Sequence, residues 1–121
     1  MSTDPRHRLG TLGERMAAEH LERLGYEIVA RNHRTRFGEI DLVAADERTL
    51  VIVEVKTRGR GGSPWDALGE RKQRQVRAMG AAYLQEVADR PRRRDLRFDA
   101  IGVTFDGGGR FVALDHIEAA F

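Results

Sequence analysis

The chain has 121 residues, of which 40% are hydrophobic and 33% are charged, and its formal net charge is +2 at pH 7. This length is typical of one domain with a hydrophobic core, so residues 1–121 are predicted to form a single domain, with disorder at residues 1–8. The absence of cysteine excludes disulfides, zinc–thiolate sites and cysteine nucleophiles. We find neither a signal peptide nor the run of ~18 apolar residues that a membrane span needs. We therefore expect a soluble, cytoplasmic protein without a membrane partner.

The first predicted element is a helix from about residue 9 to residue 24. Gly25 is expected to end this helix, because glycine tolerates the left-handed conformation found at helix ends. Tyr26–Ala30 is typical of a short strand, and the polar, basic segment Arg31–Gly38 indicates a loop or an irregular strand end. The apolar residues with helical spacing are Leu12, Met16, Ala17, Leu21 and Leu24.

The two clearest strands are residues 39–44 and 50–56, both rich in Ile, Leu and Val. The polar segment 45–49 between them has the length of a hairpin loop. A glycine-rich loop follows at residues 58–63, and Ser63 and Pro64 are candidates for the cap and first position of the next helix.

That next helix is predicted over residues 66–89, and Gly69 could divide it into a short and a long piece. Two strands follow at residues 96–105 and 111–117, joined by a turn at residues 106–109. The order of elements is αβββαββ, which predicts a mixed central sheet with helices packed against it. The apolar face of the second helix comprises Val76, Met79, Ala82, Tyr83 and Val87.

Charged residues interrupt the two apolar strands 39–44 and 50–56. Side chains alternate along a strand, so Glu39 and Asp41 are expected on one face, opposite Ile40 and Leu42. Glu54 and Lys56 are likewise expected on one face of the second strand. If the hairpin turn is centred on residues 47–48, Asp41 lies opposite Glu54 and Glu39 lies opposite Lys56.

Two adjacent carboxylates, those of Asp41 and Glu54, are unfavourable without a cation. A hard divalent ion, Mg²⁺ or Mn²⁺, resolves this conflict, with the Val55 backbone carbonyl as a third ligand. Lys56 could then position water or stabilise charge on a phosphate. The structural alternative is a cross-strand salt bridge between Glu39 and Lys56, with edge solvation of the remaining charges.

An acidic residue followed by Glu-x-Lys on the next strand is the signature of the PD-(D/E)xK nuclease superfamily. The whole chain resembles, more closely, the YraN-like family of small bacterial proteins, which is similar to archaeal Holliday junction resolvases. The matching stretches, in order, are Gly13-Glu14 with Ala17 or Ala18, Leu24-Gly25-Tyr26, Arg31-Asn32-His33-Arg34, residues 38–43, residues 53–58, Lys72, Arg97-Phe98-Asp99 and Ala120-Phe121.

This resemblance implies a restriction-endonuclease-like α/β fold and a divalent-metal-dependent DNA endonuclease, with branched DNA as a candidate substrate. It assigns metal ligation to Asp41 and Glu54 and the catalytic lysine role to Lys56, and it brings Glu14 to the same site. The residue before Asp41 is Ile40, whereas the motif is named for a proline. Dimerisation is expected only by analogy with resolvases, which act as symmetric dimers.

The basic residues near this site are candidates for phosphate contacts, although a solvated surface charge is the alternative for each of them. Glu39 is expected either to support the metal ligands or to pair with Lys56, and Asp99 is expected to be structural and to pair with an arginine. Two other functions remain open: a nucleic-acid-binding module with little or no catalysis, and a structural protein whose charges form salt bridges. The candidate phosphate contacts are Arg31, Arg34, Arg36, Arg58, Arg60 and Lys72.

Overall fold

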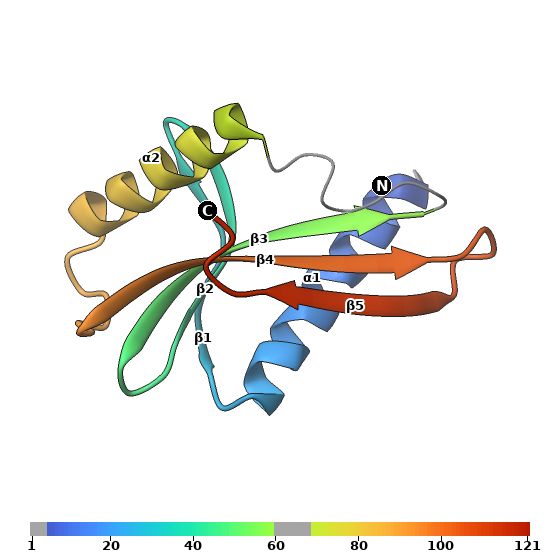
Figure 1. The fold of residues 1–121 in the computed structure, drawn as a ribbon, viewed down its shortest axis with the longest axis horizontal. Helices are drawn as coiled ribbons and strands as arrows, with labels where there is room; N and C mark the ends of the chain where they lie inside the picture. Colours follow the sequence, from blue (N-terminus) through green and yellow to red (C-terminus); the bar gives the residue numbers. More distant parts are fainter. Residues whose placement is uncertain (1–4, 60–68) are drawn as a thin grey trace.

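The computed structural model describes residues 5–59 and 69–121 (Figure 1). The order of elements, αβββαββ, confirms the prediction. The elements are α1 (Pro5–Arg23), β1 (Glu27–Thr35), β2 (Gly38–Ala45), β3 (Thr49–Arg58), α2 (Glu70–Glu86), β4 (Asp95–Phe105) and β5 (Phe111–Ile117).

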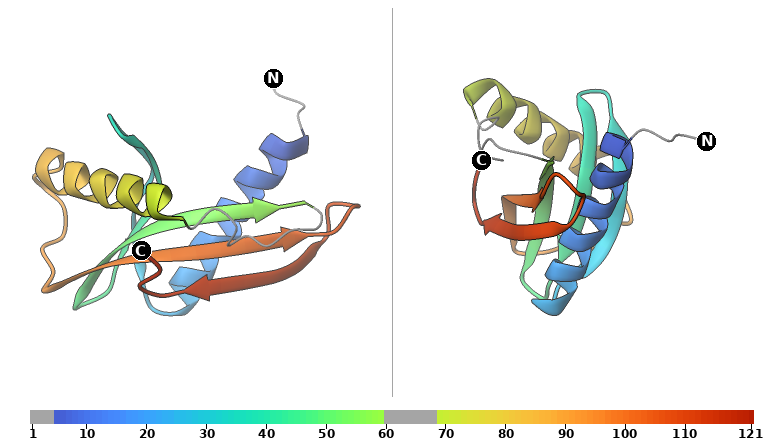
Figure 2. Two further views of the ribbon diagram at one scale, coloured as in Figure 1. Left: turned by 45° about the horizontal axis from the view of Figure 1, so that its top comes forward. Right: turned by 90° about the vertical axis from the view of Figure 1, so that its right-hand side faces the viewer.

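The strands form one five-stranded mixed sheet in the order β1-β2-β3-β4-β5. β3 and β4 are parallel, and every other neighbouring pair is antiparallel. A parallel pair needs a crossover connection, and α2 lies in the segment that makes it. α1 and α2 cover opposite faces of the sheet (Figure 2), which confirms the mixed α/β class. Within the described ranges, no helix is both long and apolar enough to cross a membrane.

The segment Arg31–Gly38 is mostly strand and not a loop, and its irregularity at Asn32, with a φ of +50°, agrees with the second predicted alternative, an irregular strand end. β1 continues to Thr35 and pairs with β2 up to the Thr35↔Gly38 pair. The Thr35 hydroxyl donates to the Gly38 carbonyl at 2.8 Å and accepts from the Phe37 N–H at 3.1 Å. Polar composition left a loop open as an alternative, but strand pairing and this turn satisfy the backbone of the segment.

The ends of both helices also differ from the prediction. α1 begins at Pro5, so residues 5–8 are helical where disorder was expected, while residues 1–4 lie outside the described residues. α2 runs from Glu70 to Glu86 with Gly69 as its N-cap. The predicted helix start, with its candidates Ser63 and Pro64, and the candidate phosphate contact Arg60 lie outside the described residues.

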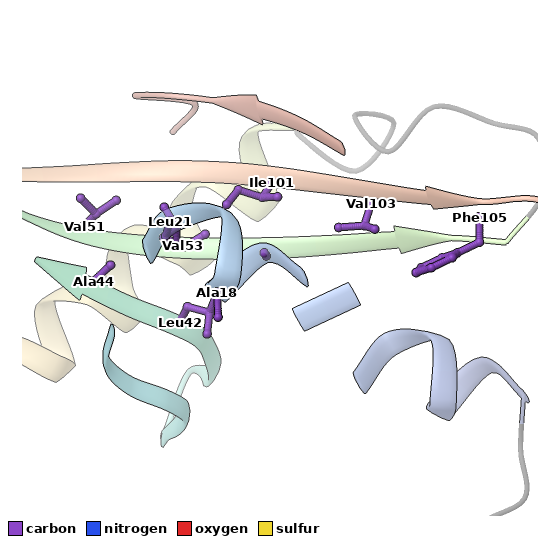
Figure 3. Packing of buried hydrophobic residues seen from close by; sticks show 10 residues of the cluster. Ala18, Leu21, Leu42, Ala44, Val51, Val53, Ile101, Val103 and Phe105 are labelled. Carbon is purple, nitrogen blue, oxygen red and sulfur yellow. The ribbon is translucent and has the colours of Figure 1, made fainter. Parts of the chain in front are cut away.

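α1 packs against one face of the sheet through small and branched side chains. Ala17, Ala18 and Leu21 are fully buried there, and Figure 3 shows Ala18 and Leu21 over the strand residues. The residues of the sheet in this cluster are Leu42, Ala44, Val51, Val53, Ile101, Val103 and Phe105.

α2 covers the opposite face with the apolar stripe that the sequence predicted. Val76, Met79, Ala82 and Tyr83 are all buried. Val87 is only partly buried and lies after the last helical residue. The strand residues in this second cluster are Ile40, Val43, Ala45, Leu50, Ile52 and Ala100.

Gly25 ends α1 as predicted, with a φ of +97°. The Tyr26 N–H donates to the Leu21 carbonyl at 3.0 Å, and the Gly25 N–H donates to the Glu22 carbonyl at 3.0 Å. These two bonds form a Schellman motif. It turns the chain directly from α1 into β1.

Gly13 allows α1 to approach β3 closely. A Cβ atom at this position would overlap the Thr57 hydroxyl, whereas a Cβ at Gly10, one turn earlier, would meet nothing within 4 Å. The close approach sets the position of Glu14, the next residue of the helix.

Gly13→Ala is therefore expected to destabilise the protein by about 1–3 kcal/mol, the usual cost of overpacking. Gly10→Ala is expected to stabilise it by up to about 1 kcal/mol, through higher helix propensity alone. Urea unfolding would compare both variants with the double variant Gly13→Ala/Thr57→Ala, which should recover most of the loss. Equal effects of the two single substitutions would contradict the close contact.

Candidate active site

The hairpin of β2 and β3 has the predicted register. Leu42 pairs with Val53, and Ala45 pairs with Leu50. The next residues of the two strands, Asp41 and Glu54, therefore follow the last pair of the ladder. The predicted juxtaposition of these two carboxylates is confirmed at the point where β2 and β3 separate.

The side-chain alternation of β2 breaks at Asp41, which the sequence did not indicate. Ile40 packs in the cluster beneath α2, but Leu42 packs in the cluster beneath α1. The expectation that Ile40 and Leu42 share a face is therefore wrong. On the neighbouring strand β1, Asn32 lies between the paired residues Arg31 and His33 and has a φ of +50°. Both strands are thus irregular at the same level of the sheet.

The irregularity directs the Asp41 carboxylate toward β3. Its Oδ2 accepts a hydrogen bond of 2.7 Å from the Val55 N–H. The side chain thereby takes the place of a backbone acceptor where pairing with β2 has ended. The Val55 carbonyl lies on the same edge of β3 as its N–H, as in any extended strand, and so faces the same region.

Glu54 is buried and pairs with α2 instead of β2. The Lys72 Nζ lies 2.6 Å from the Glu54 Oε1, and both side chains are largely shielded from solvent. Lys72 is in the first turn of α2, so this ion pair connects the start of the helix to the Glu54 carboxylate on β3. Sequence analysis placed Lys72 among the phosphate contacts, but the structure brings it to the proposed metal ligand.

The Asp41 carboxyl resists ionisation. Burial, then the nearby charges of Glu54 and Glu14, raise its pKa to about 7, against the opposing effects of the Val55 hydrogen bond and Lys72. Neighbouring like charges have this effect when no cation balances them. The site therefore has an excess of negative charge at neutral pH, although Lys72 already pairs with Glu54.

Asn32 connects two further carboxylates to this site. With its amide oriented to satisfy both neighbours, its nitrogen donates to the Glu14 Oε2 at 3.0 Å and to the Glu39 Oε1 at 2.9 Å. Glu39 also pairs with Arg34, its cross-strand partner, at 3.6 Å. The alternative pairing of Glu39 with Lys56 is therefore replaced by contacts to β1.

The donor set fits a hard divalent cation. Asp41 and Glu54 offer carboxylate oxygens, and the Val55 carbonyl offers a third oxygen, which is the chemistry that Mg²⁺ and Mn²⁺ prefer. Among the described residues, no three acidic or histidine side chains are grouped closely enough to hold an ion by themselves. Glu14 thus lies close enough to raise the Asp41 pKa without completing a three-carboxylate site.

The predicted basic residues are dispersed. Arg31 and Arg34 are exposed on β1, and the Arg36 guanidinium lies 4.8 Å from the centre of the Phe37 ring at the hairpin turn. Arg58 ends β3 and is half-buried. Lys56 is also half-buried, two residues beyond Glu54 on the same strand. Arg60 lies outside the described residues.

Asp99 is structural, as predicted, and pairs with an arginine. It is fully buried, and its two oxygens accept from the Arg97 Nε at 2.8 Å and Nη2 at 2.9 Å. His116 Nε2 lies 2.8 Å from the Asp99 Oδ2, and the His116 Nδ1 lies 3.0 Å from the His20 Nε2. Burial and the neighbouring His116 lower the pKa of His20. This network lies on the face of the sheet that α1 covers.

The structure adds one residue to the site that pattern analysis did not single out, Asn32. It appeared in the sequence only as part of a matching stretch. Asparagine is among the few residues other than glycine that tolerate positive φ. The asparagine at position 32 was therefore the feature of the sequence that could have indicated a local irregularity in β1.

Comparison with known proteins assigns the chain to a family. The profile described as "Uncharacterised protein family UPF0102" matches residues 13–103. The UPF0102 protein of Herpetosiphon aurantiacus is 43% identical over 121 residues, which covers 96% of this chain and 95% of that protein. The UPF0102 protein of Nocardia farcinica is 44% identical over 115 residues, with 93% and 88% covered. The UPF0102 protein of Pelotomaculum thermopropionicum is 41% identical over 120 residues, with 98% of each chain covered. The chain therefore belongs to the UPF0102 family, the YraN-like proteins.

Proposed function

We propose that this protein is a divalent-metal-dependent DNA endonuclease that hydrolyses phosphodiester bonds. The observation that carries the proposal is the pair Asp41 and Glu54 at the end of the β2–β3 ladder, where ionisation of Asp41 is strongly disfavoured. Buried like charges need compensation, and two carboxylates beside a backbone carbonyl are suited to Mg²⁺ or Mn²⁺. The resemblance to PD-(D/E)xK nucleases, with their restriction-endonuclease-like fold, supports the same function.

Each residue of the site has a chemical role in this proposal. Asp41, Glu54 and the Val55 carbonyl would hold the cation, which would supply Lewis acidity toward a phosphate oxygen when bound. Lys56 would position the attacking water or stabilise charge on the phosphate. Glu14 and Glu39, joined by Asn32, would orient the site from the side of β1.

The substrate would be held through its phosphate groups by basic side chains. Phosphate contacts of this kind position DNA without reading its sequence. Similarity to Holliday junction resolvases makes branched DNA the preferred candidate, and by the same analogy the protein would act as a homodimer. The proposed contacts are Arg31, Arg34, Arg36, Arg58 and Arg60.

The test is a cleavage panel with labelled duplex, single-stranded, flap and four-way-junction DNA in Mg²⁺ or Mn²⁺. The wild type is expected to cleave at least one substrate, and Asp41→Ala and Glu54→Ala are expected to abolish cleavage. Lys56→Met is expected to slow it by about 100- to 1000-fold while DNA binding persists.

Glu47→Gln is the matched control, because Glu47 is an exposed carboxylate in the β2–β3 turn, at the other end of the hairpin. It should cleave at the wild-type rate. If the wild type binds DNA but cleaves no member of the panel with either metal, the nuclease proposal fails in favour of a nucleic-acid-binding module.

A further inference from the structure

Lys72 is the cation that the structure places at the proposed metal ligands. Its Nζ pairs with the Glu54 Oε1 at 2.6 Å, and its charge also acts on Asp41. Lys56, which the sequence motif assigns to catalysis, is not among the groups that most affect Asp41. Lys72 on α2 therefore acts on both carboxylates.

The contact neutralises only one of the two carboxylates. Glu54 has Lys72 as its partner, whereas Asp41 accepts a hydrogen bond from the Val55 N–H and forms no ion pair of its own among the described residues. The Glu54 Oε1 that Lys72 contacts is one of the oxygen atoms that a divalent cation held by both carboxylates would use. An ammonium and a divalent ion at contact distances repel each other strongly in a partly buried site, so both cannot occupy this position.

Within the described ranges, Lys72 also reaches the surface. It lines a surface hollow of about 470 Å³ at the start of α2, together with Gly69, Arg71 and Gln75. Its side chain is 23% exposed, compared with 9% for Glu54. The ammonium can therefore move into solvent by rotating its long, flexible stem, without movement of the helix.

We propose that Lys72 is a built-in counter-ion, which holds Glu54 in the metal-free protein and competes with the divalent cation for this carboxylate. The proposal rests on the proposed metal site. It implies that metal binding releases the Lys72 ammonium, which then becomes free to contact a phosphate group of the substrate.

The experiment measures Mn²⁺ affinity by isothermal titration calorimetry, without DNA. Lys72→Met is expected to bind Mn²⁺ at least about tenfold more tightly than the wild type, because no internal cation has to be displaced. Lys72→Arg keeps the charge and should bind like the wild type. Arg74→Met is the matched control, since Arg74 is an exposed cation on the same helix that pairs with Glu70.

Thermal unfolding gives a second readout. Metal-free Lys72→Met should unfold at a lower temperature than the wild type, because Glu54 is left buried without a partner, and saturating Mn²⁺ should remove this difference. If Lys72→Met does not fold without metal, Lys72→Gln, which keeps a hydrogen-bond donor, replaces it in both measurements.

The possible outcomes separate the two proposals. Equal Mn²⁺ affinity in the wild type and Lys72→Met, or weaker affinity in the variant, overturns the competition while the metal site stands. Absence of Mn²⁺ binding in the wild type and in every Lys72 variant overturns both the metal site and the competition.

Discussion

Asp41→Asn is expected to stabilise the metal-free protein strongly at pH 8, by raising its unfolding temperature more than about 10 °C. The Asp41 carboxyl has a pKa of about 7 in the folded protein, compared with 3.8 as its ordinary value, because burial and the charges of Glu54 and Glu14 oppose ionisation. A difference of this size corresponds to roughly 4 kcal/mol against the ionised folded state. Asparagine removes the charge but keeps an oxygen that can accept from the Val55 N–H.

The stabilisation should depend on pH in a defined direction. Between pH 3.8 and about 7, the folded wild type keeps a proton on Asp41 that the unfolded chain has lost. Stability then falls as pH rises, because the folded state binds more protons. The advantage of the asparagine variant should therefore grow from about pH 4 to pH 7 and level off above it.

Urea unfolding of both proteins between pH 5 and pH 8.5, with a chelator present, would measure this dependence. Glu47→Gln, an exposed carboxylate in the β2–β3 turn, should show little change at any pH. With saturating Mn²⁺ the order is expected to reverse, since the wild type gains stability from the ion and the variant lacks a ligand. A pH-independent difference between Asp41→Asn and the wild type would mean that the carboxylates do not repel each other.

The same substitution at Glu54 would be less informative. Glu54 pairs with Lys72 at 2.6 Å, so Glu54→Gln would relieve repulsion of Asp41 but also remove the partner of a partly buried lysine. The two effects oppose each other. Substitution of Asp41 therefore tests the effect of the excess negative charge without also removing the partner of Lys72.

The strands and their register were predictable because local sequence determines them. The polar loop between residues 45 and 49 fixes the hairpin, and the apolar runs on each side align Leu42 with Val53. Hairpin register follows from loop length and patterning. The predicted adjacency of Asp41 and Glu54 needed no further information.

The break in β2 was not predictable, because the alternation rule assumes a regular pleat. Ile40 and Leu42 pack on different faces, and Asn32 on the neighbouring strand β1 adopts a positive φ at the same level of the sheet. The contact of Lys72 with Glu54 was also not predictable from the sequence, because it depends on how α2 lies across the sheet. Neither feature has a signature in the spacing of residues along a strand.

The network around Asp99 was only partly predictable, for the same reason. The Arg97–Asp99 pair is local, two residues apart on β4. The contacts of Arg97 with Tyr26 and of His116 with His20 join residues separated by 71 and 96 positions. Such contacts form only when α1, β4 and β5 come together in the folded protein. Local sequence therefore could not predict them.

Asp99→Ala is expected to destabilise the protein by about 3–5 kcal/mol, the usual effect of removing one partner from a buried ion pair. Asp99 is fully buried and accepts bonds from Arg97, from His116 and from the Ala119 N–H at 3.1 Å. Its loss leaves the largely buried Arg97 guanidinium with the Tyr26 hydroxyl at 2.8 Å and the more distant Glu118 carboxylate at 3.6 Å among the described residues. Urea unfolding at pH 7 would measure the loss.

Asp95→Ala on the same strand is the matched control. Asp95 pairs with Arg48 at 3.5 Å, and both side chains are at least half exposed, so its removal should cost less than about 1 kcal/mol. The double variant Arg97→Leu/Asp99→Leu should be more stable than Asp99→Ala, because it leaves no unpaired charge in the interior. If Asp99→Ala and Asp95→Ala were equally stable, Asp99 could not be the residue that ties β4, β5 and the C-terminal segment together.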